Sequence, residues 1–426
     1  MQDYLSPLLE FLRIDTTSAK GKGAEGAKWL RDFMQDRGVN AELIPWPNTN
    51  PYLIGEINVG SDRTLLIYNH YDVQPAEPLE KWDSDPFNPV VKDGRIYARG
   101  VADDKGTLMA RLLKVVELWK AGKLKVNVKF VYEGEEEIGS PHAFEFLSKF
   151  RERLRGDWLI WEGSGRAPNG APEVVLGVKG LLYVEVRART AKDLHSMYSP
   201  IADNPMWRIV YFLSEVRSPD GHVNLPGFYD RVRWLSREEL EYLNLDPELL
   251  AKAISQEVRD GLAYVRLVSM PSLNIDGALT GYTGEGSKTV IPSYAFVKLD
   301  FRLVPDQDPE EVFKELQEVA SKYGLELVRL GSVRPFRTPM SSRIAQALIR
   351  AAERVYGVRP VVMPNSPGTG PMESFSRALG IKEIADGAGV VNYDSNIHSF
   401  NENAPVEDYY LAMKWAEEMI KELSSG

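Results

Sequence analysis

The sequence predicts an α/β fold, a mixed sheet with helices on both faces, interrupted by an inserted ferredoxin-like α+β domain. Three observations support this. Strand-like and helix-like segments alternate up to about residue 177 and again after about residue 334, as in βαβ units. Between these points the segments follow the order βαββαβ, the split ferredoxin-like motif. A length of 426 residues exceeds what one ordinary core supports, so two domains are expected.

Local patterns justify the elements of the first part. Apolar residues at helical spacing predict helices, and short runs of β-branched and aromatic residues between turn residues predict strands. The predicted helices span residues 4–12, 24–36, 107–122 and 141–154. The predicted strands span residues 41–46, 51–57, 63–69, 126–132 and 157–161. After residue 334 the same patterns predict a helix over 341–357, a strand over 359–364 and a further helix.

The middle part has a different rhythm. Helices are predicted over residues 204–216 and 308–324, and strands over 181–190, 271–277, 293–304 and 325–330. Residues 218–270 form an acidic insertion, and we expect it to present a solvated helical face. The simplest organisation is a discontinuous main domain, residues 1–178 and 335–426, with a smaller domain inserted at residues 179–334.

Composition limits the classes of function. A net charge of -10 and a pI near 5.3 argue against binding to nucleic acid or to a membrane, because both select for clustered Lys and Arg. The N-terminus lacks a basic segment followed by a long apolar one, and no apolar run approaches the length of about 18 residues that a spanning helix needs. A cytoplasmic protein is therefore expected.

The chain contains no cysteine, which excludes thiolate ligands and a cysteine nucleophile. Any metal must be held by His, Asp and Glu, a donor set that suits zinc, manganese or cobalt. Ligands of open α/β sheets bind at the carboxyl ends of the strands. Candidate groups follow four strand-like segments and are expected to converge in one cleft: His70 and Asp72, Asp103 and Asp104, Glu136 and Glu137, and Glu162.

Convergence creates a charge problem. Several carboxylates in one cleft repel one another, so some would bind protons unless cations lie among them. Two divalent ions would offset most of this charge, and a dinuclear site can activate a water and polarise a carbonyl. Such a site needs a bridging carboxylate, an imidazole and a carboxylate for each metal, and one further carboxylate to accept the proton of the water.

Six motifs occur in order along the chain. They are NHYDVQP, ARGVADDKG, EGEEEIGS, LRGDWLIWEG, DLHS with an Asn-Pro pair nine positions beyond His195, and NIHSFNEN. Together they resemble the cocatalytic zinc metallopeptidase family of carnosinase-type dipeptidases, glutamate carboxypeptidase, aminoacylase, acetylornithine deacetylase and succinyl-diaminopimelate desuccinylase. The match runs over almost the whole chain. It implies a zinc-exopeptidase-like sheet domain and an inserted lid or dimerisation domain.

The resemblance also implies two divalent metal ions per chain, zinc in the first place, with cobalt or manganese as alternatives. Asp72 would orient a ligand, and Glu136 would be the general base that takes a proton from the bridging water. The Asp103–Asp104 peptide bond is often cis in this family. The implied ligands are His70 and Glu162 for one metal, Glu137 and His398 for the other, and Asp103 as the bridge.

The inserted domain would supply further family residues. His195 resembles the histidine that stabilises the developing oxyanion and that reaches over from the partner subunit in dimeric relatives. Arg302 resembles the arginine that grips a substrate carboxylate. Asn204, Gly368 and Thr369 are expected to make further substrate contacts. We therefore expect a homodimer built through the inserted domain.

The implied function is hydrolysis of an amide or peptide bond next to a free carboxylate by a dipeptidase or carboxypeptidase, with a small peptide or N-acyl amino acid as substrate. The alternative is an N-acyl amino acid deacylase of the acetylornithine deacetylase or succinyl-diaminopimelate desuccinylase type. Those relatives have a shorter inserted domain, so residues 218–270 argue against it. A second alternative is a non-catalytic metal-binding interaction protein. Glu136 and His195 argue against that, because neither is needed to hold metal.

Two segments depart from the family pattern. Met197, Ser199 and Pro200 stand where relatives have glycines. SPGTGPMESF, residues 366–375, stands in the place of a Gly-Gly-Ser substrate loop. The resemblance therefore predicts the metal site and leaves substrate preference open.

The other polar residues near the motifs are expected to have structural roles. Glu133 is expected to support its neighbours, Glu135 to be solvated and dispensable, and Asp104 to cap the following helix. His142 and His222 match no motif and are expected to be structural or solvent-facing.

Overall fold

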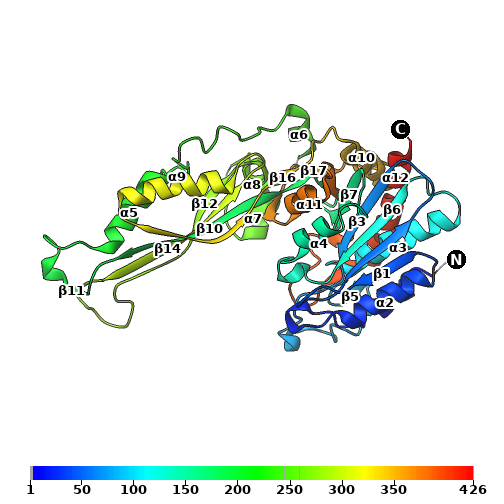
Figure 1. The fold of residues 1–426 in the computed structure, drawn as a ribbon, viewed down its shortest axis with the longest axis horizontal. Coiled ribbons are helices and arrows are strands. Elements are labelled where there is room, and N and C mark those ends of the chain that lie inside the picture. The colour runs from blue at the N-terminus through cyan, green and yellow to red at the C-terminus, as the bar shows by residue number, and fades with distance from the viewer. Residues whose placement is uncertain (1–2, 244, 259, 426) are drawn as a thin grey trace.

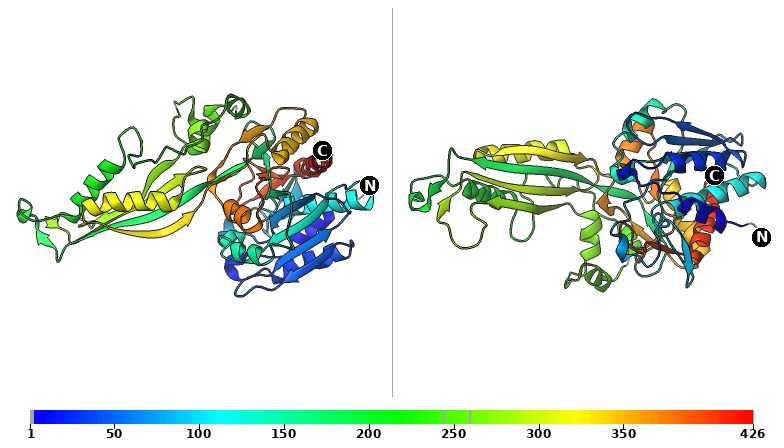
Figure 2. Two further views of the ribbon diagram at one scale, coloured as in Figure 1. Left: turned by 45° about the horizontal axis from the view of Figure 1, so that its top comes forward. Right: turned by 90° about the horizontal axis from the view of Figure 1, so that it is seen from below.

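The chain folds into two lobes that lie end to end (Figure 1). The computed structural model describes residues 3–243, 245–258 and 260–425. The N-terminal and C-terminal segments together form the main lobe. The residues from β10 (Gly177–Arg189) to β15 (Glu326–Val333) form the inserted lobe, which projects away from the main lobe in each view (Figure 2).

An eight-stranded sheet organises the main lobe. The strands β6, β3, β7 and β19 pair in parallel, whereas β1 and β2 pair antiparallel with each other, and β2 pairs antiparallel with β6. The predicted mixed sheet is therefore confirmed. Its order and bounds are β1 (Asn40–Ile44), β2 (Tyr52–Ile57), β6 (Asn127–Glu133), β3 (Thr64–His70), β7 (Trp158–Trp161), β19 (Ile384–Asp386), β9 (Glu173–Val175) and β17 (Val361–Met363).

Two cores lie on opposite faces of this sheet, because successive side chains of a strand point to opposite sides. In β3, Leu65 and Ile67 enter one core, and Leu66 and Tyr68 enter the other. The second core is covered by α4 (Ala143–Lys149) and α11 (Met372–Leu379). The first is covered by α1 (Leu5–Leu12), α2 (Ala24–Gln35), α3 (Lys105–Lys120), α10 (Arg343–Tyr356) and α12 (Val406–Ser424).

The inserted lobe is a sheet covered by helices on one face. Its strands pair antiparallel in the order β12 (Ser272–Thr280), β14 (Tyr294–Leu303), β10 and β15. Side chains of α5 (Pro205–Val216) and α9 (Pro309–Lys322) share one core with those of the sheet. This order of strands and helices is the ferredoxin-like arrangement that the sequence predicts.

The acidic insertion at residues 218–270 packs against the main lobe. It contains α6 (Arg237–Tyr242), α7 (Pro247–Ile254) and α8 (Ala263–Ser269). Leu243, Tyr264 and Val268 share one buried cluster with Val175 of β9 and Val361 of β17. The expectation of a solvated helical face is wrong for the apolar side of this segment, because that side covers the edge of the main sheet.

Short strands connect the lobes. Residues 177–179 of β10 pair with β16 (Phe336–Arg337) and β18 (Ser366–Thr369), so one strand runs through the expected domain boundary at residue 178.

Among the described residues, no helix has both the length and the apolar character to cross a bilayer. The small sheets are β4 (Val90–Lys92) with β5 (Arg95–Tyr97) and β21 (Asn403–Pro405), β8 (Ser164–Arg166) with β20 (Val391–Asn392), and β11 (Leu194–His195) with β13 (Val290–Ile291).

Candidate metal centre

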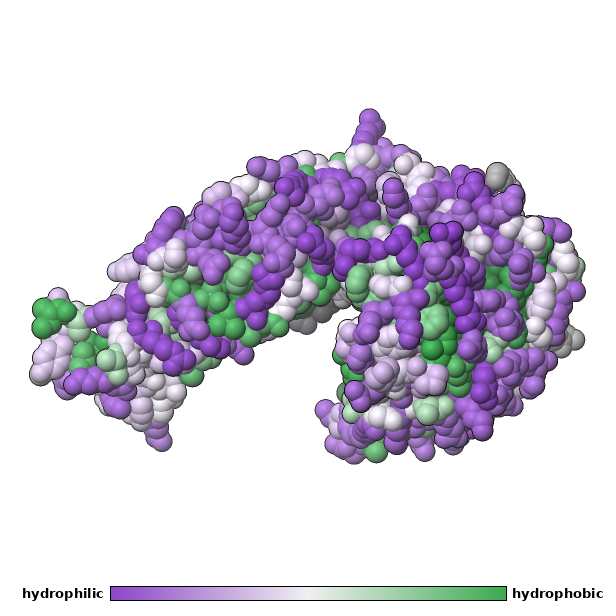
Figure 3. Space-filling model, in the orientation of Figure 1, coloured by the Kyte–Doolittle hydropathy of each residue, from purple (hydrophilic) through white to green (hydrophobic). Residues whose placement is uncertain are grey.

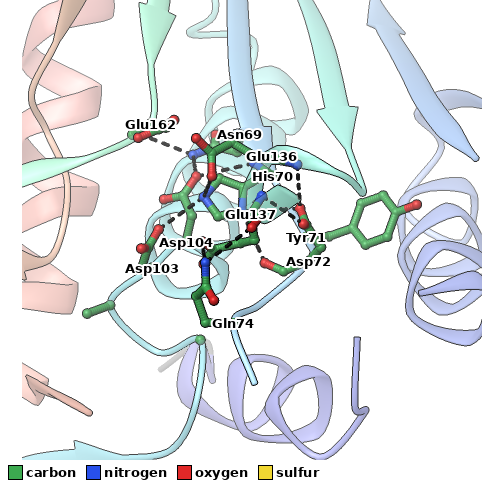
Figure 4. Close-up of polar contacts among 12 residues, drawn as sticks. Asn69, His70, Tyr71, Asp72, Gln74, Asp103, Asp104, Glu136, Glu137 and Glu162 are labelled. Carbon is green, nitrogen blue, oxygen red and sulfur yellow. Dashed lines mark hydrogen bonds and ion pairs between the residues drawn. The ribbon is translucent and has the colours of Figure 1, made fainter. Parts of the chain in front are cut away.

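Three neighbouring parallel strands deliver polar side chains to one edge of the main sheet (Figure 4). His70 is the last residue of β3, which lies between β6 and β7. Glu136 and Glu137 lie in the 3-10 turn η3 (Glu136–Ile138) after β6, and Glu162 directly follows β7. Because the carboxyl ends of parallel strands meet at one edge, these four side chains lie close together.

Asp103 reaches the same edge from outside the main sheet. The strand before it, β5, belongs to the small sheet with β4 and β21. Asp103 lies in the loop between β5 and α3, and its peptide bond with Asp104 is cis. Of the four strand-like segments that precede the candidate groups, the one before Asp103 therefore lies in a separate small sheet, and the loop after it brings Asp103 to the site.

The Asp103 carboxylate lies between two imidazoles. Its Oδ1 is 3.0 Å from Nε2 of His70, and its Oδ2 is 3.0 Å from Nε2 of His398. Nε2 of His398 is also 3.1 Å from Oε2 of Glu137, and Nε2 of His70 is 3.9 Å from Oε2 of Glu136. Each oxygen of one carboxylate thus faces a different imidazole, which is the arrangement that a bridging ligand needs.

Two overlapping groups of donor atoms in the described part of the chain could hold a metal ion. One contains His70, Asp103 and Glu137, and the other contains His70, Glu136 and Glu162. Within each group the donor atoms all lie within 4.8 Å of one another. Imidazole and carboxylate donors at this spacing suit zinc and related transition metals, so these residues fit the expected ions.

The charges of these groups are balanced through the two imidazoles. Burial alone would lower the pKa of His70, but hydrogen bonds with Asp103 and Asp72 raise it well above its ordinary value. Hydrogen bonds with Asp103 and Glu137 raise the pKa of His398 to about 10. Burial disfavours the ionised form of Asp103, yet the two histidines lower its pKa. The two imidazoles and these carboxylates thus favour one another's ionised forms.

Glu136 and Glu162 are buried acids with raised pKa values. Burial raises the pKa of Glu136 to about 7, and the like charges of Asp103 and Glu137 add to the effect. Burial and the charge of Glu136 raise the pKa of Glu162 well above its ordinary value. A carboxyl group with a pKa near 7 can accept and release a proton at neutral pH, which is the property of a general base.

Asp72 connects the ends of β3 and β6. Its carboxylate accepts hydrogen bonds from the backbone N–H groups of Glu136 at 3.2 Å and Glu137 at 3.0 Å. Its Oδ1 is also 3.4 Å from Nδ1 of His70, and the same nitrogen is 3.0 Å from the Asp72 carbonyl oxygen. Asp72 is therefore in position to orient His70 and the turn that carries both glutamates.

The other two glutamates of EGEEEIGS are fully buried. Glu133 accepts a hydrogen bond from the Tyr68 hydroxyl at 2.7 Å. Glu135 accepts hydrogen bonds from the Tyr52 hydroxyl at 2.6 Å and from the backbone N–H of His142 at 3.1 Å, and its Oε2 is 2.9 Å from Nδ1 of His142. The expectation that Glu135 is solvated is wrong, because its carboxylate ties the turn to β2 and to the start of α4.

Asp104 and Arg111 form a buried polar group behind the site. Asp104 occupies the N-cap position of α3, but its side chain makes no capping hydrogen bond, so the expected capping role is wrong. It accepts a hydrogen bond from Nδ2 of Asn69 at 2.7 Å. Burial raises the pKa of Asp104 to about 7, and the charges of His70 and Arg111 partly offset this rise. Sequence reasoning missed Arg111, which donates to the Trp161 and Gly387 carbonyl oxygens. The sequence feature that could have indicated its buried role is the position of this arginine within the apolar run TLMARLLKVV.

Three of the expected substrate residues lie beside the cluster. Nη1 of Arg302, on β14, donates to the Thr369 hydroxyl at 2.9 Å. Gly368 and Thr369, at the end of β18, line a cavity of about 200 Å³. Glu136 and Glu162 line the same cavity, so one small ligand can reach both the raised-pKa glutamates and Thr369.

His195 and Asn204 lie away from the cluster. His195 is exposed in β11, at the tip of the inserted lobe that is farthest from the main lobe (Figure 1). Its Nδ1 accepts a hydrogen bond from the backbone N–H of Met197 at 3.1 Å. Asn204 caps α5, and its side-chain oxygen accepts from the backbone N–H of Met206 at 3.0 Å. The fold of one chain therefore does not bring either residue to the cluster.

Comparisons with known proteins cover the whole cluster. The model of "Peptidase family M20/M25/M40" matches residues 66–422. The Beta-Ala-His dipeptidase of Mus musculus is 29% identical, over 97% of this chain and 86% of its own. A Cys-Gly metallodipeptidase of Saccharomyces cerevisiae is 28% identical, over 89% of this chain and 84% of its own. Among solved structures, the M20 family metallo-carboxypeptidase Sso-CP2 from Sulfolobus solfataricus is 43% identical, with a TM-score of 0.87 and 100% of both chains covered.

These similarities confirm the resemblance that six motifs indicate. The matched region extends over both histidines that face the Asp103 carboxylate. The relatives are dipeptidases and a carboxypeptidase, and the sheet edge of this chain carries imidazole and carboxylate groups that could hold a metal ion. The chain therefore belongs to peptidase family M20/M25/M40 and is a metal-dependent peptidase.

Proposed function

We propose that the protein is a dinuclear dipeptidase or carboxypeptidase that hydrolyses an amide bond next to a free carboxylate. The main support is the Asp103 carboxylate, whose two oxygens each lie 3.0 Å from a different imidazole. His70 and Glu162 would hold one ion, His398 and Glu137 the other, and Asp103 would bridge both. Zinc is the proposed metal, with cobalt or manganese as alternatives. When bound, such ions lower the pKa of a water and polarise a carbonyl.

The chain's own residues would move the proton and orient the substrate. Glu136 lines the cavity, and its pKa of about 7 suits a base that takes a proton from the attacking water and gives it to the leaving amine. Asp72 binds the backbone N–H of Glu136 and so aims this base. Arg302 and Thr369, which are hydrogen-bonded to each other, would bind the free carboxylate of the substrate.

We also propose that two chains associate through the inserted lobe and that His195 of each chain serves the site of the other. Figure 3 shows hydrophobic surface on this lobe. Exposed apolar side chains lie on α5 and on the edge strand β12: Trp207, Tyr211, Ile275 and Leu279. The position of His195, at the tip of the inserted lobe, supports action on a second chain.

Glu136→Gln tests the assignment of the base. The variant should keep two metal ions per chain by elemental analysis, while kcat falls by about 10²- to 10⁴-fold because the proton acceptor is lost. Glu145→Gln is the matched control, since Glu145 is an exposed glutamate of α4. Full activity in Glu136→Gln would remove the base assignment.

A substrate panel tests the class of reaction. We expect kcat/KM to be higher for dipeptides and N-blocked peptides than for N-acetyl and N-succinyl amino acids. The opposite preference would favour a deacylase. Metal binding without hydrolysis of any member of the panel would favour a non-catalytic metal-binding protein.

Subunit complementation tests the role of His195. The variants Glu136→Gln and His195→Ala should each be inactive alone. A mixed dimer would combine an intact Glu136 from one chain with an intact His195 from the other, so mixing the variants should restore activity. No recovery of activity in mixed dimers would mean that His195 does not act across subunits. If light scattering shows a monomer under conditions of full activity, the proposed dimer is wrong.

A further inference from the structure

Glu402 is a buried carboxylate in the motif NIHSFNEN, four positions beyond His398. Its side chain is 1% exposed. Its Oε2 accepts hydrogen bonds from Nη1 of Arg99 at 2.8 Å and from the backbone N–H of Gly100 at 2.9 Å. Its Oε1 accepts from the backbone N–H groups of Ala102 and Asp103, both at 3.0 Å. Both oxygens of Glu402 are therefore used, and three of the four donors are amides of one loop.

This loop carries the carboxylate that lies between the two imidazoles. It follows β5 and ends at Asp103, so it lacks the support of the main sheet. The backbone of Glu402 binds the same segment, because its carbonyl oxygen accepts from the N–H of Ala98 at 3.1 Å. Pairing of β21 with β5, with Asn403 opposite Tyr97, fixes the register of this contact. The position of Asp103 thus depends on a residue 299 positions away in the sequence.

The segment of Glu402 also carries His398. Three non-glycine residues of this segment are left-handed: Asn396 with φ 53°, His398 with φ 60° and Asn401 with φ 56°. Such backbone is uncommon outside glycine and persists only when surrounding contacts hold it. The Glu402 side chain is one such contact, since it fastens the segment to the loop of Asp103.

The negative charge of Glu402 has a local partner. The Arg99 guanidinium is 2% exposed, donates to the Pro75 carbonyl oxygen at 3.1 Å and lies 5.3 Å from the centre of the Trp82 ring. A buried carboxylate is tolerated only with such pairing and with hydrogen bonds to its remaining lone pairs. The hydrogen bonds of the Glu402 side chain to this loop go to backbone N–H groups, and none joins it to the Asp103 carboxylate or the His398 imidazole. The carboxylates of Glu402 and Asp103 also repel each other through space.

We propose that Glu402 is a positioning residue that locks the Asp103 loop against the His398 segment and so sets the separation of these two ligands before metal binds. The inference rests on the proposed dinuclear centre. It adds a residue that touches neither metal nor substrate and that nonetheless determines how tightly metal is held. Outer groups that orient ligands contribute about 10- to 100-fold to metal affinity or activity in other metal sites.

Glu402→Gln is the first test. The amide has the shape of the carboxylate, but its NH2 group cannot accept a hydrogen bond. In one orientation it faces the N–H groups of Ala102 and Asp103, and in the other it faces Arg99 and the N–H of Gly100. We expect the dissociation constant for zinc, measured from zinc bound per chain at buffered free zinc, to rise by about 10- to 100-fold. At saturating zinc the KM for a dipeptide should stay near that of the wild type, because Arg302 and Thr369 do not contact Glu402, while kcat falls.

Glu239→Gln is the matched control. Glu239 also accepts from an arginine and a backbone N–H, from Nη2 of Arg337 at 2.8 Å and from Ser236 at 2.7 Å, but it lies in α6, outside the main sheet. This variant should lose stability and keep the zinc affinity of the wild type. Equal zinc affinity and kcat in Glu402→Gln and the wild type, with only a loss of stability, would overturn the proposal. A wild-type protein that binds fewer than two zinc ions would instead overturn the dinuclear centre.

If Glu402→Gln does not fold, hydrogen exchange of the wild-type protein tests the proposal instead. If Glu402 holds the loop before metal binds, the amides of Gly100, Ala102 and Asp103 should remain protected in both the zinc-loaded and the zinc-free protein. Loss of protection on zinc removal would show that metal holds the loop, and the proposal would be wrong.

Discussion

The substitutions Glu135→Gln and Glu136→Gln distinguish the roles of two adjacent glutamates, because the first should lower stability and the second should lower kcat. Glu135 lies next to the proposed base Glu136, yet its carboxylate is fully buried and points to Tyr52 and His142. The change removes one charge and leaves the shape of the side chain unchanged. We expect it to lower the free energy of unfolding and to leave the metal count unchanged.

The magnitude follows from the three contacts of Glu135. An amide oxygen can still accept from the Tyr52 hydroxyl and from the backbone N–H of His142, but no longer as a charged acceptor. The amide NH2 would replace the Oε2 that lies 2.9 Å from Nδ1 of His142. Hydrogen bonds to charged groups contribute about 1.5–3 kcal/mol each, so a loss on the order of 1.5–3 kcal/mol is expected.

Urea unfolding of the metal-loaded protein measures this loss. Glu145→Gln provides the baseline, because substitutions at exposed positions change stability by about 0.5 kcal/mol or less. A decrease of the urea midpoint at constant m-value would show a true loss of stability. If Glu135→Gln unfolds at the same urea concentration as Glu145→Gln, the buried network around Glu135 does not stabilise the fold and the reasoning is refuted.

Three further predictions concern metal, substrate and pH. Dialysis against a chelator should lower the free energy of unfolding by about 2.7 kcal/mol for each metal site, relative to protein in free metal at 100 times the dissociation constant. Hydrogen exchange should rise most at residues 136–138. Arg302→Lys should raise KM for a dipeptide by about tenfold with a smaller change in kcat, since an ammonium group cannot form the bidentate contact; an unchanged KM would contradict this. Burial and the charge of Asp386 raise the pKa of Glu173 from 4.5 to about 7. The folded protein therefore keeps a proton that the unfolded chain releases, and stability should fall as pH rises from 4.5 to about 7. Glu173→Gln should remove this part of the pH dependence in urea titrations, and parallel curves for the two proteins would contradict it.

The sequence alone determined the elements whose pattern is local. Leu65, Leu66, Ile67 and Tyr68 predict a buried strand because all four are apolar, and the structure buries them in two cores on opposite faces. The order βαββαβ likewise predicts the inserted sheet, because alternation and helix spacing are properties of short segments. Motif order along the chain was enough to indicate the family, since it does not depend on which strands are neighbours.

Tertiary structure alone decided which polar groups lose contact with water and what they bind. Glu135 and Asp104 have no local feature that marks them as buried, and their partners lie on other elements. Asp103 reaches the site from a loop, and a residue 299 positions away holds that loop. The apolar side of the acidic insertion covers the edge of the main sheet, which its composition does not indicate. A hydrogen bond or a buried contact between distant residues depends on the packing of the whole chain, so no pattern in a short segment can predict it.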